Sequence, residues 1–284
     1  MGCLWGVERG IGTVAEEKKN IFRNNIFIEG LQGSGKTTLL TKIVKKCPDY
    51  KAYREGDLSP VELAWCSYMS EEEFQKALER FPAWEEEIRK RTMQEGEAYI
   101  TAYTLILAED RAFYEYMESH EIYNGRVDFE RFRHVIMQRY ADFSGNGNVF
   151  ECSFFQNSIE SMMLFYEMPD EEIVAFYREA FDLLKDKAFK LVYLDNEKIR
   201  ENLLQIRKER CDDKGNEMWF PLMMGYLKES PYGKSHGCQD MEDLIAHFER
   251  RRALELRIIR EVIGQKALIL KAKQYNDEEL KEIK

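Results

Sequence analysis

The sequence predicts an α/β fold in which helices cover both faces of a five-stranded parallel sheet. Five short apolar segments have the length and flanking turn residues of strands, and helical stretches separate them along the chain. The first strand leads directly into a glycine-rich turn and a helix. Because strands joined by helical crossovers form parallel sheets, these observations together indicate a three-layer architecture.

The five predicted strands cover residues 25–29, 50–54, 149–152, 189–194 and 266–271. Pro48 and Asp49 mark the entry to the second strand, and the turn sequence at 144–148 precedes the third. Residues from about 60 to 146 hold no predicted strand and are too many for one crossover. We therefore expect a long helical insertion between strands two and three, on the substrate side.

Helix signals fill the segments between the strands. Leu39 and Ile43 have helical spacing after the glycine-rich turn, and Asp128 is a candidate N-cap. Ser70 and Glu73 form a capping box. Other predicted helices cover residues 84–119, 158–167, 170–185, 197–210 and 240–263, and a last one begins at 276. Residues 211–238 form a polar, glycine-containing stretch to which we assign no element, and we expect an N-terminal extension over 1–24 and one domain over 25–284.

The composition narrows the classes of partner. The chain has 284 residues, a formal net charge of −10 and six cysteines without a close pair. An acidic chain has no basic surplus to displace counterions, so we expect no nucleic-acid polymer as partner. The cysteine spacing indicates neither a zinc knuckle nor a redox motif, and no apolar run approaches the ~20 residues of a membrane span. We expect a cytoplasmic protein without a membrane partner, and the sequence leaves a homodimer open.

The glycine-rich turn carries the complete phosphate-binding (Walker A) pattern, Gly30-x4-Gly35-Lys36-Thr37. Glycines let the backbone N–H groups point at phosphate oxygens, and the following helix adds a favourable dipole. Lys36 would reach the β- and γ-phosphates, and the Thr37 hydroxyl would bind Mg²⁺. The residues expected to bind ATP are Gly30, Gly33, Ser34, Gly35, Lys36, Thr37 and Thr38.

Three segments resemble the thymidylate kinase and deoxynucleoside kinase superfamily of P-loop NTPases. Residues 28–38 look like its first motif, and residues 53–57 with Ser59-Pro60 resemble its Arg-Glu-Pro segment. Residues 192–196, followed by Arg200, Arg207 and Arg210, resemble its strand and arginine-bearing lid. The resemblance spans most of residues 25–271 and implies a P-loop kinase that uses ATP and Mg²⁺ to phosphorylate a nucleoside, a nucleotide or a similar small acceptor.

Two departures leave the acceptor open. The nucleotide kinases of this superfamily have Asp-Arg-Tyr after the third strand, whereas this chain has Glu151-Cys-Ser153. That sequence is nearer to the Glu-Arg-Ser of deoxynucleoside kinases but lacks the arginine. The insertion is also longer than in either branch.

Carboxylates follow three of the predicted strands, at the sheet edge where ligands bind in such folds. We predict that Glu151 takes the acceptor proton or holds Mg²⁺ through water, the alternative being a solvated surface acid. Arg54, Glu55 and Asp57 are expected to bind the acceptor, or else to be turn residues. Asp195 is expected to cap the next helix.

Arginines supply the remaining candidates. Arg207 and Arg210 share one face of a predicted helix, where they would close over the phosphates as a catalytic lid or pair with neighbouring glutamates. The loop over 212–216 would be the hinge. Residues 250–252, with two further arginines, form a basic patch that would either approach the nucleotide or, as we favour, be a solvated face with alternating charge.

The sequence thus favours an ATP- and Mg²⁺-dependent phosphotransferase with a small-molecule phosphoryl acceptor. The alternative is a P-loop NTPase with a regulatory, protein-partnered role, in which water would be the acceptor. A protein that only senses nucleotide is a third hypothesis, which the intact Lys36-Thr37 pair disfavours.

Overall fold

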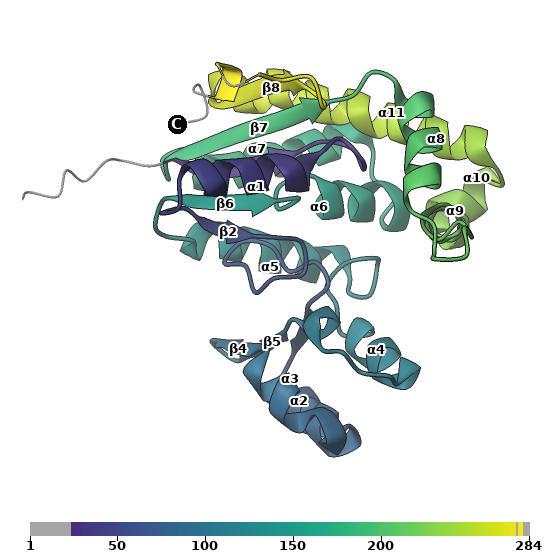
Figure 1. Ribbon diagram of the computed structural model, residues 1–284. Coiled ribbons are helices and arrows are strands. Elements are labelled where there is room, and N and C mark those ends of the chain that lie inside the picture. Colours follow the sequence, from purple (N-terminus) through teal and green to yellow (C-terminus); the bar gives the residue numbers. More distant parts are fainter. Residues whose placement is uncertain (1–23, 277, 281–284) are drawn as a thin grey trace, which may run out of the picture.

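The main element of the protein is the predicted five-stranded parallel sheet (Figure 1), seen in a computed structural model that describes residues 24–276 and 278–280. The strands lie in the order β2-β6-β1-β7-β8. Their bounds differ from the predicted ones by no more than one residue: β1 (Asn25–Glu29), β2 (Lys51–Tyr53), β6 (Asn148–Glu151), β7 (Phe189–Asp195) and β8 (Ala267–Lys271). The predicted N-terminal extension, apart from its last residue, lies outside the described residues.

β1 is the central strand, with Phe27 in register with Phe150 of β6 on one side and Leu191 of β7 on the other. From β1 the chain passes to β2 at one edge of the sheet, whereas from β7 it passes to β8 at the opposite edge. The connections that follow these two neighbouring strands therefore run in opposite directions. In open α/β sheets the crevice at such a switch point is where ligands bind.

Alternation along β1 divides the core into two layers. Ile26 and Ile28 pack on one face against Leu39 and Leu40 of α1 (Lys36–Lys46). Phe27 points to the other face, where its ring centroid lies 4.8 Å from that of Phe150. Since successive strand residues point to opposite faces, this run of apolar residues requires cover on both sides.

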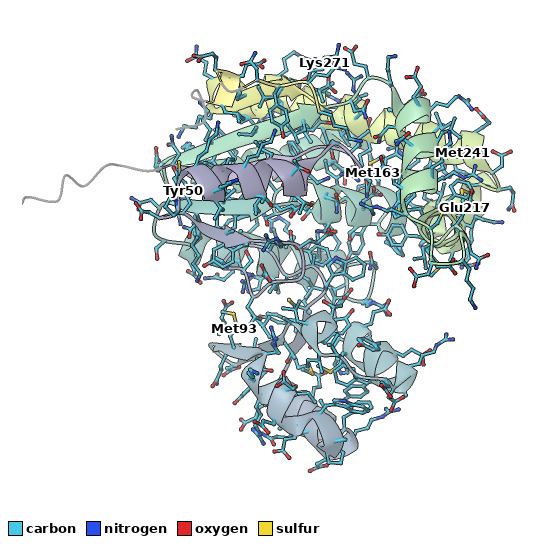
Figure 2. The ribbon with its side chains drawn as sticks, in the orientation of Figure 1. Tyr50, Met93, Met163, Glu217, Met241 and Lys271 are labelled. Atoms are coloured by element: carbon cyan, nitrogen blue, oxygen red, sulfur yellow. The ribbon has the colours of Figure 1, made fainter. Side chains whose placement is uncertain are left out.

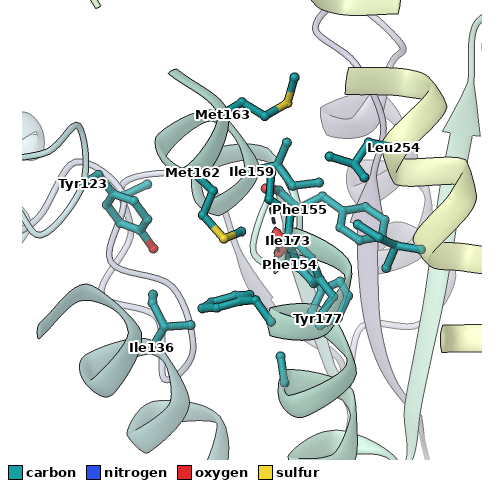
Figure 3. Close-up of a cluster of buried hydrophobic side chains, with 14 of the residues drawn as sticks. Tyr123, Ile136, Phe154, Phe155, Ile159, Met162, Met163, Ile173, Tyr177 and Leu254 are labelled. Carbon is teal, nitrogen blue, oxygen red and sulfur yellow. Dashed lines mark hydrogen bonds between the residues drawn. The ribbon is translucent and has the colours of Figure 1, made fainter. Parts of the chain in front are cut away.

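The second face is covered by α5 (Phe129–Asp142), α6 (Gln156–Glu160), α7 (Asp170–Leu184) and α11 (Met241–Ile258). α6 and α11 continue as π-helices, η3 (Ser161–Phe165) and η4 (Ile259–Ile263). Figure 3 shows part of this core. The ring of Tyr177 lies 5.2 Å from that of Phe155, and its buried hydroxyl donates to the Phe154 carbonyl at 3.0 Å.

The insertion is not purely helical, so that prediction is wrong. It contains a three-stranded antiparallel sheet in the order β3-β5-β4, with β3 (Ser67–Met69), β4 (Thr92–Glu95) and β5 (Ala98–Thr101). The remaining pieces are α2 (Glu71–Arg80), η1 (Pro82–Trp84), α3 (Glu85–Lys90), η2 (Tyr103–Leu105) and α4 (Arg111–Glu118), followed by α5. The capping box at Ser70 and the N-cap at Asp128 are confirmed.

The hairpin that was missed is closed at Gly96, which has a φ of +56°. Its β-branched and aromatic residues favour strands, and Ile100 packs in the main core while Phe74 of α2 stacks on Tyr99. Figure 1 shows α2, α3 and the hairpin projecting away from the main body beyond β2, and in Figure 2 Met93 marks β4 there. The insertion therefore has a small core of its own around α2 and α4.

The stretch over 211–238, to which no element was assigned, contains two helices. After α8 (Ile199–Glu209) the chain forms α9 (Trp219–Glu229) and α10 (Pro231–His236). An apolar face containing Met224 and Leu227 is buried against the core, which is what stabilises α9. At the end of the described chain Asn276 caps the N–H groups of Glu278 and Glu279, and the rest of the predicted last helix lies outside the described residues. Within the described residues, no helix combines the length and the apolar character needed to cross a bilayer.

Candidate active site

The glycine-rich loop that carries the phosphate-binding sequence pattern occupies the turn between β1 and α1, at the switch point of the sheet. Gly30 and Gly33 have φ values of +136° and +75°, which L-residues with side chains rarely adopt. A Cβ on Gly30 would lie 2.5 Å from the Leu194 carbonyl oxygen, and one on Gly33 would lie 2.4 Å from Cδ1 of Ile206 in α8. The loop is therefore held tightly between β7 and α8.

Lys36 begins α1, and its ammonium turns back onto the loop. Its Nζ donates to the carbonyl oxygens of Gly30 at 2.7 Å and Leu31 at 3.1 Å, and the residue is only 7% exposed. The side chain thus lies across the concave side of the turn. A buried cation at a helix N-terminus is arranged to attract an anion.

Thr37 and Glu151 are in direct contact although they lie far apart in the sequence. The Thr37 hydroxyl donates to Oε1 of Glu151, which ends β6. Burial raises the pKa of Glu151, while the Thr37 hydrogen bond and the Lys36 charge act in the opposite direction. The structure therefore brings together the two residues predicted to share Mg²⁺.

The donor chemistry of this pair fits Mg²⁺, which prefers hydroxyl, carboxylate, phosphate and water oxygens. Within the described residues no group of three or more His, Cys, Asp and Glu side chains is arranged so that it could hold a metal ion. A magnesium ion here would be held by Thr37 and Glu151 with phosphate oxygens and water, as is usual for Mg²⁺ bound to a nucleotide.

The three residues predicted to bind the acceptor have different surroundings. Oε1 of Glu55 accepts a hydrogen bond from Nε2 of Gln156 at 2.9 Å, and its charge acts on Glu151. Asp57 instead accepts from the backbone N–H of Arg54 at 2.7 Å, which closes the turn after β2. Arg54 itself is exposed. The structure therefore places Glu55 beside the loop and gives Asp57 the alternative role of a turn residue.

The predicted lid arginines do not contact the loop. Arg207 forms a salt bridge with Glu217 at 2.7 Å and lies 4.2 Å from the ring centroid of Phe220. Arg210 is exposed, and its guanidinium lies 5.9 Å from the ring centroid of Trp219. Figure 2 labels Glu217 beside α8 and α9. A lid role for either arginine stays a prediction that requires these contacts to break.

α8 reaches the loop through other residues. Nδ2 of Asn202 donates to the Gln32 carbonyl at 2.7 Å, and Ile206 lies against Gly33. These contacts position the middle of the loop. Asp195, expected to cap α8, instead pairs with Arg252 at 2.6 Å, because the two side chains meet between β7 and α11.

A buried charge network that was not predicted from the sequence lies behind the loop. Arg251, fully buried, donates to Glu255 at 2.7 Å, to Glu160 at 2.6 Å and to Oε1 of Gln32 at 3.1 Å. His247 lies 2.7 Å from the other oxygen of Glu160. Burial opposes ionisation of Glu160, but His247 and Arg251 outweigh it and hold its pKa at about 2.

The interpretation of residues 250–252 as a solvated face is therefore wrong for Arg251 and correct for its neighbours. Arg250 pairs with Asp170 and Arg252 with Asp195, both partly exposed. The signal that identifies Arg251 is its i,i+4 spacing to Glu255 on the same helix face as the apolar Leu254 and Ile258. A charged pair within an apolar stripe indicates a buried ion pair.

Glu29 is a second missed acid, fully buried at the end of β1. One oxygen accepts the Phe154 backbone N–H at 2.6 Å, and the other has no hydrogen-bond partner in the described part of the chain. Burial raises the pKa of Glu29 to about 8. Its sequence signal is an acid in the last position of an otherwise apolar strand.

A cavity of about 380 Å³ opens next to the loop, and we call it the Gln32 cavity after the loop residue in its wall. The insertion contributes Trp65, Glu121 and Tyr123, α6 contributes Gln156 and Glu160, and α9 contributes Met223 and Tyr226. Glu55 completes the wall nearest to Glu151. Its size suits a small-molecule ligand, and its place under the insertion is where an acceptor was expected.

No protein-family model and no curated protein matches the chain.

Proposed function

We propose that this protein is a Mg²⁺-dependent P-loop kinase that transfers the γ-phosphoryl group of ATP to a small acceptor in the Gln32 cavity. The observation that carries the proposal is the pairing of Thr37 with Glu151 on a complete phosphate-binding loop whose own Gln32 forms part of the cavity wall. Phosphoryl transfer needs positioning and charge neutralisation, and this arrangement offers both.

The loop would bind the triphosphate through its backbone N–H groups and the N-terminus of α1. Lys36 would exchange the carbonyls of Gly30 and Leu31 for β- and γ-phosphate oxygens, which are stronger partners for an ammonium. Mg²⁺, bound by the Thr37 hydroxyl and held through water by Glu151, would neutralise the phosphate charge and leave the Glu151 carboxylate able to take a proton. An acceptor oxygen in the Gln32 cavity would then bond to the γ-phosphorus as ADP leaves.

Two carboxylates are candidates for the acceptor proton. Glu151 has a pKa raised by burial, which brings it nearer to the value of an effective base at neutral pH. Glu55 lines the cavity and accepts from Gln156, so its position is closer to where the acceptor would lie. We assign the base to Glu151 and acceptor orientation to Glu55.

The first test is ATP binding and ATP use by Lys36→Ala. We expect Lys36→Ala to lower turnover by about 10³-fold, because the ammonium would neutralise transferring charge. Lys45→Ala is the matched control, since Lys45 is exposed at the far end of the same helix. Calorimetry with ATP and Mg²⁺ gives the binding arm. No heat from any nucleoside triphosphate on folded protein would overturn the proposal.

The alternative function, a regulatory NTPase, differs from the kinase in that water accepts the γ-phosphoryl group. If ATP is hydrolysed slowly, no small hydroxyl compound accelerates its use and a protein fraction does, water is the acceptor and the kinase proposal is wrong. A coupled assay for ADP release, run with and without the compounds, separates the two outcomes.

A further inference from the structure

The Gln32 cavity is lined by carboxylates and by no basic side chain. Glu55, Glu121 and Glu160 contribute to its wall, and no Lys, Arg or His of the described residues does. Glu160 is already neutralised from behind by Arg251 and His247. The negative charge that remains for a ligand comes from Glu55 and from Glu121; burial raises the pKa of Glu121 to about 7, so a bound cation would favour its ionised form.

Glu121 has the geometry of a ligand-binding acid. It is 3% exposed, and its Oε1 accepts the Tyr103 hydroxyl at 2.6 Å. The residue also lines the Gln32 cavity. Arg126 acts on Glu121 from outside the cavity, where it pairs with Glu118.

Aromatic and apolar side chains form the mouth of the same cavity. Trp65 is 46% exposed and Leu222 is 69% exposed, although both are large hydrophobic residues. Trp65 also has a φ of +60°, which is uncommon for a bulky residue and marks a locally strained backbone. Such strain and exposure at a cavity mouth are typical of a ring that contacts a ligand.

Resting on the proposed kinase function, we propose that the acceptor is a hydroxylated small molecule with a protonated amine and an apolar or planar face. The amine lies between Glu55 and Glu121, and the flat face lies against Trp65. A phosphomonoester is disfavoured as acceptor, because no Lys, Arg or His of the described residues lines the cavity to pair with its dianion, whereas Glu55 and Glu121 do line it.

Amide groups complete the recognition. Gln156 already holds Glu55, and Asn124 accepts the Tyr226 hydroxyl at 2.7 Å, so both amides have fixed orientations at the wall. The amide N–H groups suit hydroxyl oxygens of the acceptor. The cavity thus combines two carboxylates for a cation, amides for hydroxyls and an indole for a flat surface.

The test uses three analogues with one ring scaffold and different charge: 3′-amino-3′-deoxyadenosine, adenosine and adenosine 5′-monophosphate. A second series is 2-amino-1-phenylethanol, its N-acetyl derivative and its phosphate ester. Each is titrated with ATP and Mg²⁺ present, with the change in Trp65 fluorescence as the readout and Trp65→Phe as the background. We expect the amines to bind about tenfold or more tighter than their neutral or phosphorylated counterparts.

Variants of the cavity residues test whether the tighter binding of the amines comes from the cavity. Glu121→Gln and Glu55→Gln should each abolish the preference for the amine, while Glu130→Gln, at an exposed site on α5, should keep it. Two carboxylate variants are used because the test can still be made with one of them if the other does not fold. Equal or tighter binding of a neutral or phosphorylated analogue, or no response to either amine, overturns the inference.

ATP binding is measured on the same samples by calorimetry. If ATP binds in a Lys36-dependent manner and the amines fail, the acceptor inference is wrong and the kinase proposal stands. If ATP itself does not bind, the kinase proposal fails first.

Discussion

The phosphate-binding loop and the Gln32 cavity adjoin one another but would recognise ligands with different parts of the chain. The loop would use backbone N–H groups, whose directions are fixed by glycines and by the contacts of Gly30 and Gly33 with β7 and α8. The cavity uses side chains from the insertion, α6 and α9, which lie far apart in the sequence. The conformation of such a loop depends on glycines that lie close together in the sequence, and these form a recognisable pattern. The side chains that line the cavity come from distant parts of the sequence and form no such pattern. This difference explains why the loop was recognisable from sequence and the cavity was not.

The largest effect on stability is expected at Arg251, which donates hydrogen bonds to Gln32 of the loop and to Glu160 of the cavity wall. Arg251→Ala should destabilise the protein by about 3–5 kcal/mol, because Glu160 and Glu255 would be left as buried charges without their partner. Arg250→Ala should cost about 0–1 kcal/mol, since its pair with Asp170 is partly exposed. Urea unfolding of both variants measures the difference. Equal losses would contradict the role of the buried network.

The second prediction compares a glycine of the loop with one of the insertion. Gly30→Ala should cost about 3 kcal/mol or more, because its Cβ would collide with the Leu194 carbonyl in addition to the strained φ. Gly96→Ala should cost about 1 kcal/mol, since its φ is positive but nothing lies within 4 Å of the added Cβ. Thermal unfolding gives both values. Similar losses of stability for the two variants would mean that the backbone of β7 moves to accommodate the added methyl group.

The third prediction separates the two candidate acids by kinetics. Glu151→Gln should lower kcat by about 10²-fold, because a proton acceptor is lost. It should also remove the acid limb of the rate profile, which in the wild type lies above the ordinary carboxyl range because burial raises the pKa of Glu151. Glu55→Gln should instead raise KM for the acceptor. Steady-state assays over pH test this, and full activity of Glu151→Gln would transfer the base to Glu55.

The last prediction concerns the pH dependence of stability and the buried acid Glu29. Burial raises its pKa from 4.5 to about 8, so the folded chain holds this proton more tightly than the unfolded chain. The resulting stability is fully present below pH 4.5 and is lost as pH rises through 8, at up to about 1.4 kcal/mol per pH unit. Glu29→Gln should flatten this dependence, and exposed Glu130→Gln should not. Urea midpoints between pH 5 and 9 measure it, and an unchanged slope for Glu29→Gln would contradict the assignment.

Particular elements show which parts of the fold could be predicted from the sequence. The central sheet was predictable because runs such as residues 25–29 are apolar on both faces, and the loop because its glycine spacing is specific. The hairpin β4–β5 was missed because Tyr99 and Tyr103 have helical spacing by coincidence, so that long-range pairing decided the structure. α9 was missed because its neighbours are polar and its stability comes from packing.

The candidate site likewise contains residues that could be predicted from the sequence and residues that could not. Thr37 and Glu151 were predicted from strand–loop–helix logic, and the structure places them in contact. Glu55 was also predicted, and it lies in the cavity wall. Glu121, Arg251 and Trp65 were not, because each acquires its role only from residues that folding brings near it. Arg207 was predicted by helix position alone, which does not reveal that Glu217 holds it.

Gln32 is held at two points, its carbonyl by Asn202 and its side chain by Arg251. It also belongs to both the loop and the cavity wall. If both proposed ligands bind, displacement of Gln32 by one of them would change the surroundings of the other, and the two binding equilibria would be interdependent. Thermodynamic reciprocity then requires that whatever factor the nucleotide applies to acceptor affinity, the acceptor applies to nucleotide affinity. Cooperativity between the two ligands would thus depend on a single glutamine.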